Sequence, residues 1–515
     1  MSSDTLYRLA EDIVDLLEEF GELETKQIAK QLINSGRYHK PPINLINKAL
    51  QADLNGKVEL SGRNTWKLSK SKSIINSSVI NKSTESFAEK MDEKDSLGYF
   101  REKFHIPKQP NGADAIYFTG NSLGLQPKQT RGYIEQELKD WETFGVEGHF
   151  HAKNAWMPYH ELLTDSMAKI VGAKLSETVV MNSLTVNLHL LMVSFYRPTR
   201  KRNKIVIEAG AFPSDQYAVQ SQIKFHGFDV AESLIELKPR DGETCLRIEN
   251  IEKTIGEDSD SIALILLGGV NYYTGQAFDM RRVTEAGHKI GAVVGFDLAH
   301  AAGNIELNLH DWNVDFAAWC SYKYLNSGPG GIGGGFVHER HQSDFDLPRF
   351  AGWWGHDKET RFLMNSEFVP IKGAEGWQLS NPPIFQMAAL KASLDIFEEA
   401  GMERLTEKSR RLTGYLEFLL GDIHDERISV ITPSDANERG CQLSIRVKTE
   451  RRHLDGICQQ DAGVPSNKNL FKQISERGVI ADWREPDVIR VAPVPLYNSF
   501  SDVYKFAEIL KDCLI

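Results

Sequence analysis

From about residue 97 onward, apolar positions recur in two alternating patterns. Short apolar runs at 204–208, 261–269 and 292–296 predict buried strands. Between such runs, segments such as 128–144 and 186–195 carry apolar residues at helical spacing. Strands that alternate with helices in this way predict an α/β fold, with a largely parallel sheet covered by helices on both faces.

The first 70 residues carry a different pattern and form a separate predicted module. Residues 6–20, 25–33 and 43–54 have helical spacing, and two short strand-like runs, 58–60 and 65–68, flank a turn. Three helices and a hairpin resemble a winged-helix domain. Lysine and arginine in its second half allow a nucleic-acid-binding face. Because the module is near neutral and shows no clear recognition helix, solvated charges on a domain for protein contacts are the favoured alternative.

Differences in composition and in the apolar pattern divide the remaining chain into a linker and two domains. Residues 71–94 are rich in Ser, Lys, Asn and Glu, which is typical of a linker. A large domain with an N-terminal arm is expected over 95–411. A smaller α+β domain is expected over 412–515, where strand-like runs at 441–447 and 488–493 accompany helical segments.

The strongest chemical signal lies where two apolar runs end. The first ends on Asp297, and a second, 314–320, leads into Tyr322 and Lys323 and then into the glycine-rich stretch 327–335. Pyridoxal phosphate (PLP) needs a lysine for its Schiff base and an acid that keeps its pyridine nitrogen protonated. The glycines would let the backbone turn sharply and approach a ligand. The alternative is a solvated lysine and an aspartate that merely caps a turn.

Polar residues also follow other predicted elements. Thr185 directly precedes the helical run 186–195, and Ser214 and Asp215 follow the strand 204–208. A hydroxyl at a helix start is commonly an N-cap, yet the same geometry directs backbone N–H groups at an anion such as a cofactor phosphate. Both interpretations stay open from the residues alone.

Two further features suggest ligand contacts. The loop 352–356, GWWGH, suits stacking on, or hydrogen bonding to, a flat or anionic group. Arg490 lies inside the predicted strand 488–493, where an unpaired charge would be costly. A substrate carboxylate held by both arms of the guanidinium would satisfy it, and a structural salt bridge would do so equally well.

Composition limits the partners. The chain has 515 residues and a formal net charge of -11, which argues against a nucleic-acid partner for the chain as a whole. No apolar run is long enough to span a membrane, and residues 4–20 lack the pattern of a signal peptide, so a cytoplasmic location is expected. The five cysteines are scattered and show no metal-ligand spacing, so neither disulfides nor a metal site are expected.

Five long motifs carry a family resemblance over about residues 95–510: YFTGNSLGLQPK, GFDLAHAAGN, WCSYKYLNSGPGG, SNPPI and IRVAPVPLYNSF. Together they resemble the kynureninases, which are fold-type-I PLP enzymes related to class V aminotransferases and cysteine desulfurases. The resemblance implies a seven-stranded, mostly parallel sheet. It also implies a homodimer with shared active sites.

The resemblance implies a role for each matching residue. Lys323 would carry the Schiff base, Asp297 would pair with the pyridinium nitrogen, and Tyr322 would transfer protons during cleavage. Arg490 would bind the substrate α-carboxylate. The remaining cofactor contacts would come from Leu184, Thr185, Phe212, Ser214, Asp215, His300, Tyr322, Trp353 and Asn381, and substrate contacts from His149, Ser380 and Asn381.

The implied reaction is hydrolytic cleavage of the Cβ–Cγ bond of L-kynurenine or L-3-hydroxykynurenine. Its products would be anthranilate or 3-hydroxyanthranilate and L-alanine, within tryptophan degradation and NAD precursor synthesis. The chain departs from the family in three places. Gly268 stands where the animal enzymes have serine, residues 450–463 form an extra stretch, and the N-terminal module is additional.

Two alternative functions fit parts of the sequence. A cysteine desulfurase or selenocysteine lyase on the same fold would need a nucleophilic cysteine on a mobile loop. Only Cys458 lies in such a region. A winged-helix transcription regulator with a PLP sensor domain would explain the N-terminal module. Such a regulator would not need to keep its catalytic residues, whereas here nearly every catalytic position of the family carries a matching residue.

Overall fold

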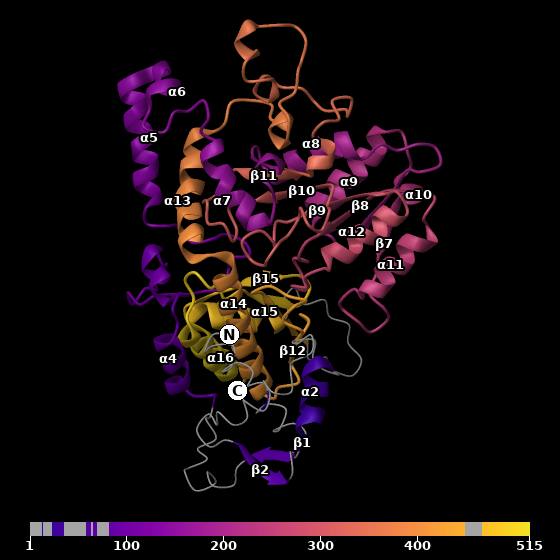
Figure 1. Cartoon of the computed structure of the whole chain (residues 1–515). Helices are drawn as coiled ribbons and strands as arrows, with labels where there is room; N and C mark the ends of the chain where they lie inside the picture. Colours follow the sequence, from indigo (N-terminus) through magenta and orange to yellow (C-terminus); the bar gives the residue numbers. More distant parts are fainter. Residues whose placement is uncertain (1–12, 14–22, 35–57, 63–64, 69–81, 449–465) are drawn as a thin grey trace, which may run out of the picture. The chain divides into compact units, whose positions relative to one another are not determined.

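The structure is a computed structural model that describes residues 13, 23–34, 58–62, 65–68, 82–448 and 466–515 (Figure 1). The chain divides into two compact units, Met1–Lys82 and Ser83–Ile515. The finer boundary expected at residue 412 stays a prediction.

The N-terminal unit contains a small antiparallel sheet with strand order β1-β3-β2. Its described elements are β1 (Leu23–Glu24), α2 (Thr25–Asn34), β2 (Val58–Gly62) and β3 (Thr65–Leu68). β2 and β3 pair as a hairpin at the position expected from the sequence. The expected helices at 6–20 and 43–54 lie outside the described residues, Ile13 excepted, so the winged-helix assignment stays a prediction.

The second unit is built on a seven-stranded sheet of order β5-β11-β10-β9-β8-β6-β7. The strands from β10 to β7 pair in parallel, and β11 runs antiparallel to both of its neighbours. The mostly parallel sheet predicted from the apolar runs is therefore confirmed. The strands are β5 (Thr178–Val180), β6 (Lys204–Glu208), β7 (Leu234–Leu237), β8 (Ile262–Gly268), β9 (Val293–Asp297), β10 (Phe316–Cys320) and β11 (Gly333–Val337).

Helices cover both faces of this sheet (Figure 1). Along β8, Leu264 and Leu266 belong to one hydrophobic cluster, whereas Ile265 and Leu267 belong to another. Because successive strand side chains point to opposite faces, burial on both faces explains the uninterrupted apolar run. The helices include α5 (Thr130–Phe144), α6 (Gly148–His151), α7 (Glu161–Val171), α8 (Leu184–Phe195), α9 (Pro213–Phe225), α10 (Val230–Ser233), α11 (Ile248–Glu257), α12 (Met280–Lys289) and α13 (Ile384–Ala400).

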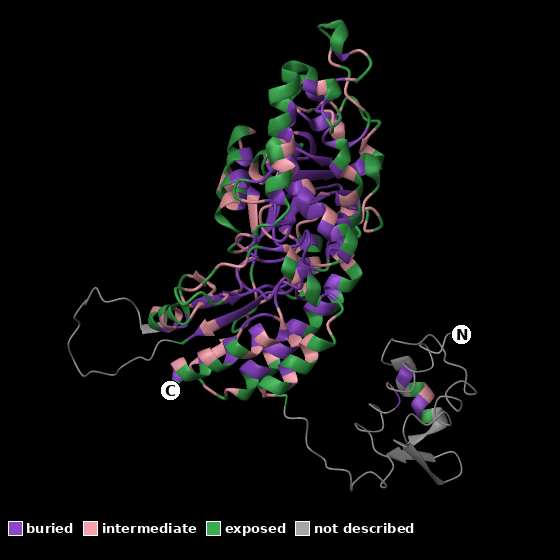
Figure 2. Cartoon of the chain, turned by 90° about the vertical axis from the view of Figure 1, so that its left-hand side faces the viewer, coloured by how far each residue is buried: buried purple, intermediate pink, exposed green. Residues whose placement is uncertain are grey.

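A four-stranded sheet of order β12-β13-β16-β15 forms the core of the C-terminal part, where Leu443, Ile489 and Phe506 are buried together. Figure 2 shows buried residues along the strands and exposed ones on the outer faces of the helices. The elements are β12 (Ile428–Val430), β13 (Leu443–Val447), β14 (Val479–Ile480), β15 (Asp482–Arg484), β16 (Val488–Val491), α14 (Met402–Asp422), α15 (Ser466–Glu476) and α16 (Phe500–Leu514).

The beginning of the second unit is tied to this C-terminal part. α4 (Glu85–Glu93) packs on α16, and β4 (Ile116–Tyr117) pairs in parallel with β14. Thr119 then bridges to Ala492, directly after β16. The turn that follows β4 is thereby brought beside the strand that carries Arg490.

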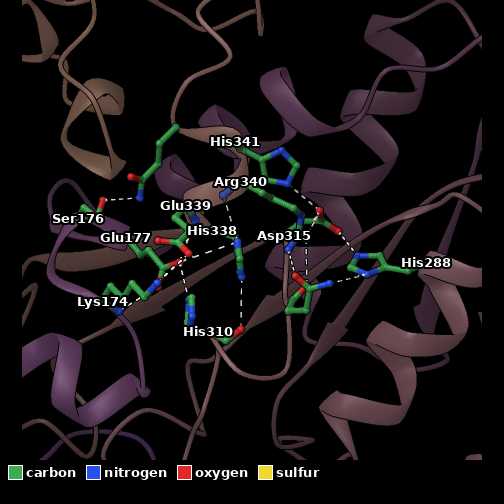
Figure 3. A network of polar contacts seen from close by, with 12 residues as sticks. Lys174, Ser176, Glu177, His288, His310, Asp315, His338, Glu339, Arg340 and His341 are labelled. Carbon is green, nitrogen blue, oxygen red and sulfur yellow. Dashed lines mark hydrogen bonds and ion pairs between the residues drawn. The ribbon is translucent and has the colours of Figure 1, made fainter.

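A polar network closes the edge of the large sheet where β9 and β10 begin (Figure 3). Asp315, directly before β10, is buried and accepts a hydrogen bond from the Val294 N–H at 2.7 Å. His288 Nε2 and His341 Nε2 each lie 2.8 Å from its carboxylate oxygens, and Arg340 pairs with it. Since a carboxylate can only accept, both histidine nitrogens donate.

A second buried carboxylate, Glu177, extends the network to β5 (Figure 3). It accepts hydrogen bonds from His310 Nδ1 at 2.9 Å and from the Glu339 N–H at 2.8 Å. The rings of His310 and His338 stack beside it with centroids 5.0 Å apart. Each buried acid at this edge therefore has several hydrogen-bond donors, as a structural anchor requires.

The Asp315→Asn variant is expected to lose about 3–5 kcal/mol of unfolding free energy near neutral pH, because Arg340 would lose its buried counter-charge and the two histidines would lose an acceptor oxygen. Burial raises the pKa of Asp315, but hydrogen bonds from His288 and His341 and the charge of Arg340 hold this pKa well below its ordinary value. This stabilisation is present above the unfolded-state pKa of about 3.9 and is lost as pH falls below it. Urea unfolding at several pH values measures both effects. Asp311→Asn, at a nearby exposed acid, should behave as wild type, and equal losses in both variants would contradict the prediction.

Candidate active site

A cavity of about 280 Å³ lies where β6, β8 and β9 end and where α8 and α9 begin. Ligands of open α/β sheets bind at this edge because the loops there leave a crevice. Among the residues expected at the site, those that line the cavity are Leu184, Thr185, Phe212, Ser214, Asp215, Asp297, His300, Tyr322 and Lys323.

Lys323 is held inside the cavity by a histidine. Its Nζ lies 2.9 Å from His300 Nε2 and 5.9 Å from the ring centroids of Phe212 and Tyr322. Burial, followed by the positive charges of Lys323, Arg490 and Arg484, lowers the pKa of His300 well below its ordinary value. A neutral His300 can accept a hydrogen bond from the lysine, while its own buried Nδ1 has no partner within the described structure.

The turn after β4 fixes the backbone beneath Lys323. The Gly124 N–H donates to the Tyr322 carbonyl at 2.8 Å, and a Cβ atom at Gly124 would overlap the carbonyl oxygen of Lys323. The motif YFTGNSLG therefore needs this glycine for packing against the lysine segment.

The Gly124→Ala variant is expected to displace Lys323 and to weaken PLP retention at least tenfold, because the added methyl group has no space. Gly132→Ala is the matched control, since nothing lies within 4 Å of a Cβ there, in α5. The control should be neutral or slightly stabilising, by up to about 1 kcal/mol. Equilibrium dialysis of PLP and thermal unfolding of both variants test this, and equal PLP retention would contradict it.

The glycine-rich stretch differs from its sequence interpretation. Gly333 to Gly335 belong to β11, which pairs antiparallel with β10. A Cβ atom at Gly334 would overlap the ring of Trp319. These glycines thus make room for a buried tryptophan, and Gly333 to Gly335 do not line the cavity.

Three carboxyl groups meet at the cavity: Glu208 at the end of β6, Asp215 in the first turn of α9 and Asp297 at the end of β9. Burial raises the pKa of Asp297, and burial together with the charge of Asp297 raises that of Asp215 well above its ordinary value. Burial also raises the pKa of Glu208 to about 7. Asp215 Oδ1 has no hydrogen-bond partner within the described structure.

This crowding of acids around one lysine fits a cationic ring. A protonated pyridine nitrogen would supply the missing positive charge beside Asp297. The N-cap of α8, Ser183, makes no side-chain capping hydrogen bond, so the backbone N–H groups that follow it can receive a phosphate. Lys323, the acids and the start of α8 are therefore suited to hold PLP.

Glu208 and Tyr272 also line the cavity but were missed in the sequence. Glu208 ends an apolar run just as Asp297 does, and this signal could have identified it. The Gly268 N–H donates to its two carboxylate oxygens at 3.2 and 3.3 Å. A Cβ atom at Gly268 would lie 2.9 Å from Glu208 Oε1, so Glu208 fills the space that a serine there would need.

Five expected contacts lie outside the cavity lining: His149, Trp353, Ser380, Asn381 and Arg490. Trp353 is 42% exposed, and its indole N–H donates to the Arg361 carbonyl at 3.2 Å. Ser380 and Asn381 are exposed just before α13, and His149 is half-buried in α6. Within one chain these residues do not meet the cavity.

Arg490 lies on β16, is 0% exposed and flanks the cavity through Tyr272. Its Nη1 donates to the Tyr272 carbonyl at 2.7 Å, and its Nη2 pairs with Asp482. The salt bridge considered from the sequence is therefore present. Its Nε has no hydrogen-bond partner within the described structure, so one buried donor remains for a ligand.

The parallel sheet, the lysine that follows β10 and the acid that ends β9 define a fold-type-I PLP enzyme. Solved structures confirm this fold. The chain matches a cysteine desulfurase from Thermococcus onnurineus with a TM-score of 0.62 at 18% identity, covering 79% of this chain and 98% of that one. It matches a C-DES mutant with glycine covalently linked to its PLP cofactor with a TM-score of 0.64 at 15% identity, covering 80% and 98%.

Sequence relatives are much closer. The chain is 61% identical over 425 residues to a kynureninase from Koribacter versatilis, covering 82% of this chain and 96% of the relative. It is 50% identical to a kynureninase from Nematostella vectensis, covering 82% and 92%. Residues 405–510 match the family model of the kynureninase C-terminal domain. The chain belongs to the kynureninase family, and its cofactor is PLP.

None of the helices in the described ranges has the length and apolar character needed to cross a membrane.

Proposed function

We propose that this chain hydrolyses the Cβ–Cγ bond of L-kynurenine or L-3-hydroxykynurenine, giving anthranilate or 3-hydroxyanthranilate and L-alanine. The observation that carries the proposal is the meeting of Lys323 and Asp297 in one cavity of a chain that is up to 61% identical to kynureninases. This reaction would serve tryptophan degradation and the supply of an NAD precursor, with the protein in the cytoplasm.

PLP, when bound, supplies an electron sink for the substrate carbon skeleton. Lys323 is the base for the substrate α-proton, because a neutral His300 holds its Nζ without adding a charge. Asp297 would keep the pyridine nitrogen of the bound cofactor protonated. The carboxyl of Asp215, whose pKa is raised further, can stay neutral beside it.

Tyr322 is the proposed proton donor during bond cleavage. Burial, followed by the interaction with the nearby Cys320, raises the pKa of its phenol well above the ordinary value. The phenol therefore keeps its proton at neutral pH and can donate it inside the cavity.

Arg490 is the proposed partner of the substrate α-carboxylate. It is buried beside the cavity and has an unsatisfied Nε–H, and a guanidinium binds carboxylates strongly. A carboxylate at this point would remove the cost of a buried unpaired donor.

A homodimer with shared sites would bring in the residues that one chain leaves outside its cavity. Trp353 and Asn381 are exposed, and large exposed aromatic side chains accompany them at Trp141, Phe150 and Phe385. Exposed apolar surface of this kind is typical of an interface. Gel filtration with activity assays tests this part, and an active monomer would contradict it.

The experiment for the reaction is a product assay on the purified full-length chain, reconstituted with PLP, with L-kynurenine and L-3-hydroxykynurenine supplied separately. Release of anthranilate or 3-hydroxyanthranilate with equimolar alanine is expected, and the ratio of kcat/KM values identifies the preferred substrate. Cleavage of neither compound by protein that retains PLP would overturn the proposal.

The same protein should release no sulfur from L-cysteine at a comparable rate. Among the described residues, no cysteine lines the cavity. Cys458, which the desulfurase alternative would require, lies outside the described residues. The desulfurase alternative is therefore not favoured. The nucleic-acid or protein partner suggested for the N-terminal module remains a prediction.

A further inference from the structure

Arg490 and Arg484 both donate hydrogen bonds to one oxygen of a third charged residue, Asp482. Asp482 on β15 lies directly opposite Arg490 on β16. Its Oδ2 accepts hydrogen bonds from Arg490 Nη2, from Ser122 Oγ and, at 3.1 Å, from Arg484 Nη2. Ser122 Oγ also accepts from Arg490 Nη2 at 3.2 Å.

The cluster holds two positive charges and one negative charge. The side chains of Arg490 and Asp482 are 1% and 12% exposed, so this pair lies largely out of water, whereas Arg484, which brings the net charge to +1, is 36% exposed. The next ion pair on this sheet is separate, because Asp487 binds the Tyr273 hydroxyl and lies 3.5 Å from Arg446. The other titratable groups that line the nearby cavity are Glu208, Asp215, Tyr272, Asp297, His300, Tyr322 and Lys323. Burial, followed by the positive charges of Lys323, Arg490 and Arg484, lowers the pKa of His300, so this histidine is neutral.

We propose that Asp482 is a specificity-determining residue: its carboxylate is the resident counter-ion of Arg490, and with Arg484 it sets the charge that an incoming carboxylate meets. This inference rests on the proposed role of Arg490. A net charge of +1 matches one α-carboxylate. The Nε of Arg490 is free to bind it, while Asp482 keeps Nη2 occupied.

The charge count gives opposite expectations for two substitutions. Asp482→Asn keeps the shape and an acceptor oxygen but raises the net charge to +2, so carboxylates should bind more tightly. Arg484→Gln lowers the net charge to zero, so carboxylates should bind more weakly. Each change should be roughly tenfold or more, because a unit charge a few ångströms away in a partly buried site is weakly screened. If Asp482 and Arg484 only position the side chain of Arg490, both substitutions should instead weaken carboxylate binding.

The test uses the PLP-loaded full-length enzyme and acetate as the probe, with chloride at equal ionic strength as reference. Two quantities are measured: the constant for inhibition of kynurenine cleavage by acetate, and the rise in melting temperature that acetate causes. The second does not depend on turnover. Asp487→Asn, on the neighbouring ion pair, is the matched control and should leave both unchanged. Asp482→Glu, which keeps the charge, should resemble wild type.

The expected result is a lower acetate inhibition constant and kynurenine KM in Asp482→Asn and higher values in Arg484→Gln. Weaker acetate binding in both variants, or no change in either, would overturn the proposal. If Asp482→Asn does not fold, the Arg484→Gln variant alone tests the proposal. Unchanged acetate binding in Arg484→Gln would show that the net charge of the cluster does not set the affinity for carboxylates. If wild type cleaves no kynurenine yet the melting temperatures follow the expected order, the proposed function falls and the counter-ion role stands.

Discussion

The Lys323→Ala variant is expected to lose at least about 10⁴-fold in the rate of kynurenine cleavage, since the residue would serve both as covalent anchor and as base. It should also lose PLP during gel filtration, and with it the visible absorbance of the bound cofactor. Its fold should persist, because the lysine side chain makes one hydrogen-bond contact, with His300, and two ring contacts within the described structure. Absorbance spectra, PLP content and a product assay measure these effects.

Lys128→Ala is the matched control, because Lys128 is exposed at the start of the α5 region. It should retain PLP and activity at wild-type levels. A Lys323→Ala enzyme that still cleaves kynurenine within tenfold of wild type would show that another group supplies the base.

The Asp297→Asn variant should lose about 10²–10³-fold in kcat/KM while gaining stability in the absence of PLP. The activity falls because an amide cannot hold the pyridine nitrogen in its protonated form, and loss of one strong electrostatic contact at a reacting centre has about this effect.

The stability of the PLP-free protein should rise in this variant because Asp297 is a buried acid with a raised pKa. Burial raises the pKa of Asp297 in the folded PLP-free protein, so the unfolded chain loses this proton at lower pH. Stability therefore decreases as pH rises from about 4 through the folded pKa, and the amide escapes this decrease. Thermal unfolding of the PLP-free proteins between pH 4 and pH 8 measures it. A variant that is less stable than wild type throughout this range would contradict the explanation.

The sequence predicted those site residues that stand where apolar runs end. Asp297 and Lys323 were predicted because one apolar run ends on Asp297 and another leads into Lys323, and the structure places both in the lining of one cavity. The sheet itself was predictable for the same reason, since burial on both faces leaves strands without polar alternation.

Other features depend on contacts that no local pattern encodes. The glycines of β11 were interpreted as a ligand-binding turn. In the structure they leave room for the Trp319 ring on the paired strand β10, and this contact follows from the strand pairing, not from the local sequence. Glu208 is different, because it ends an apolar run as Asp297 does; it was overlooked because a charged residue at the end of a strand is usually solvated. Trp353 and Asn381 do not line the cavity of their own chain, so the contacts expected of them stay a prediction.

The two edges of the large sheet differ in how their buried acids are compensated. Asp315 and Glu177 have histidine or arginine partners, whereas Glu208, Asp215 and Asp297 line a cavity that contains a single lysine. In a deep mutational scan, substitutions at the two edges should therefore differ in their effects on protein abundance and activity. Substitutions at the first edge should lower protein abundance and activity together. Neutral substitutions at the second should raise abundance of the PLP-free protein while strongly lowering turnover, so selection for yield alone would drive this enzyme toward a much less active, better-folding form.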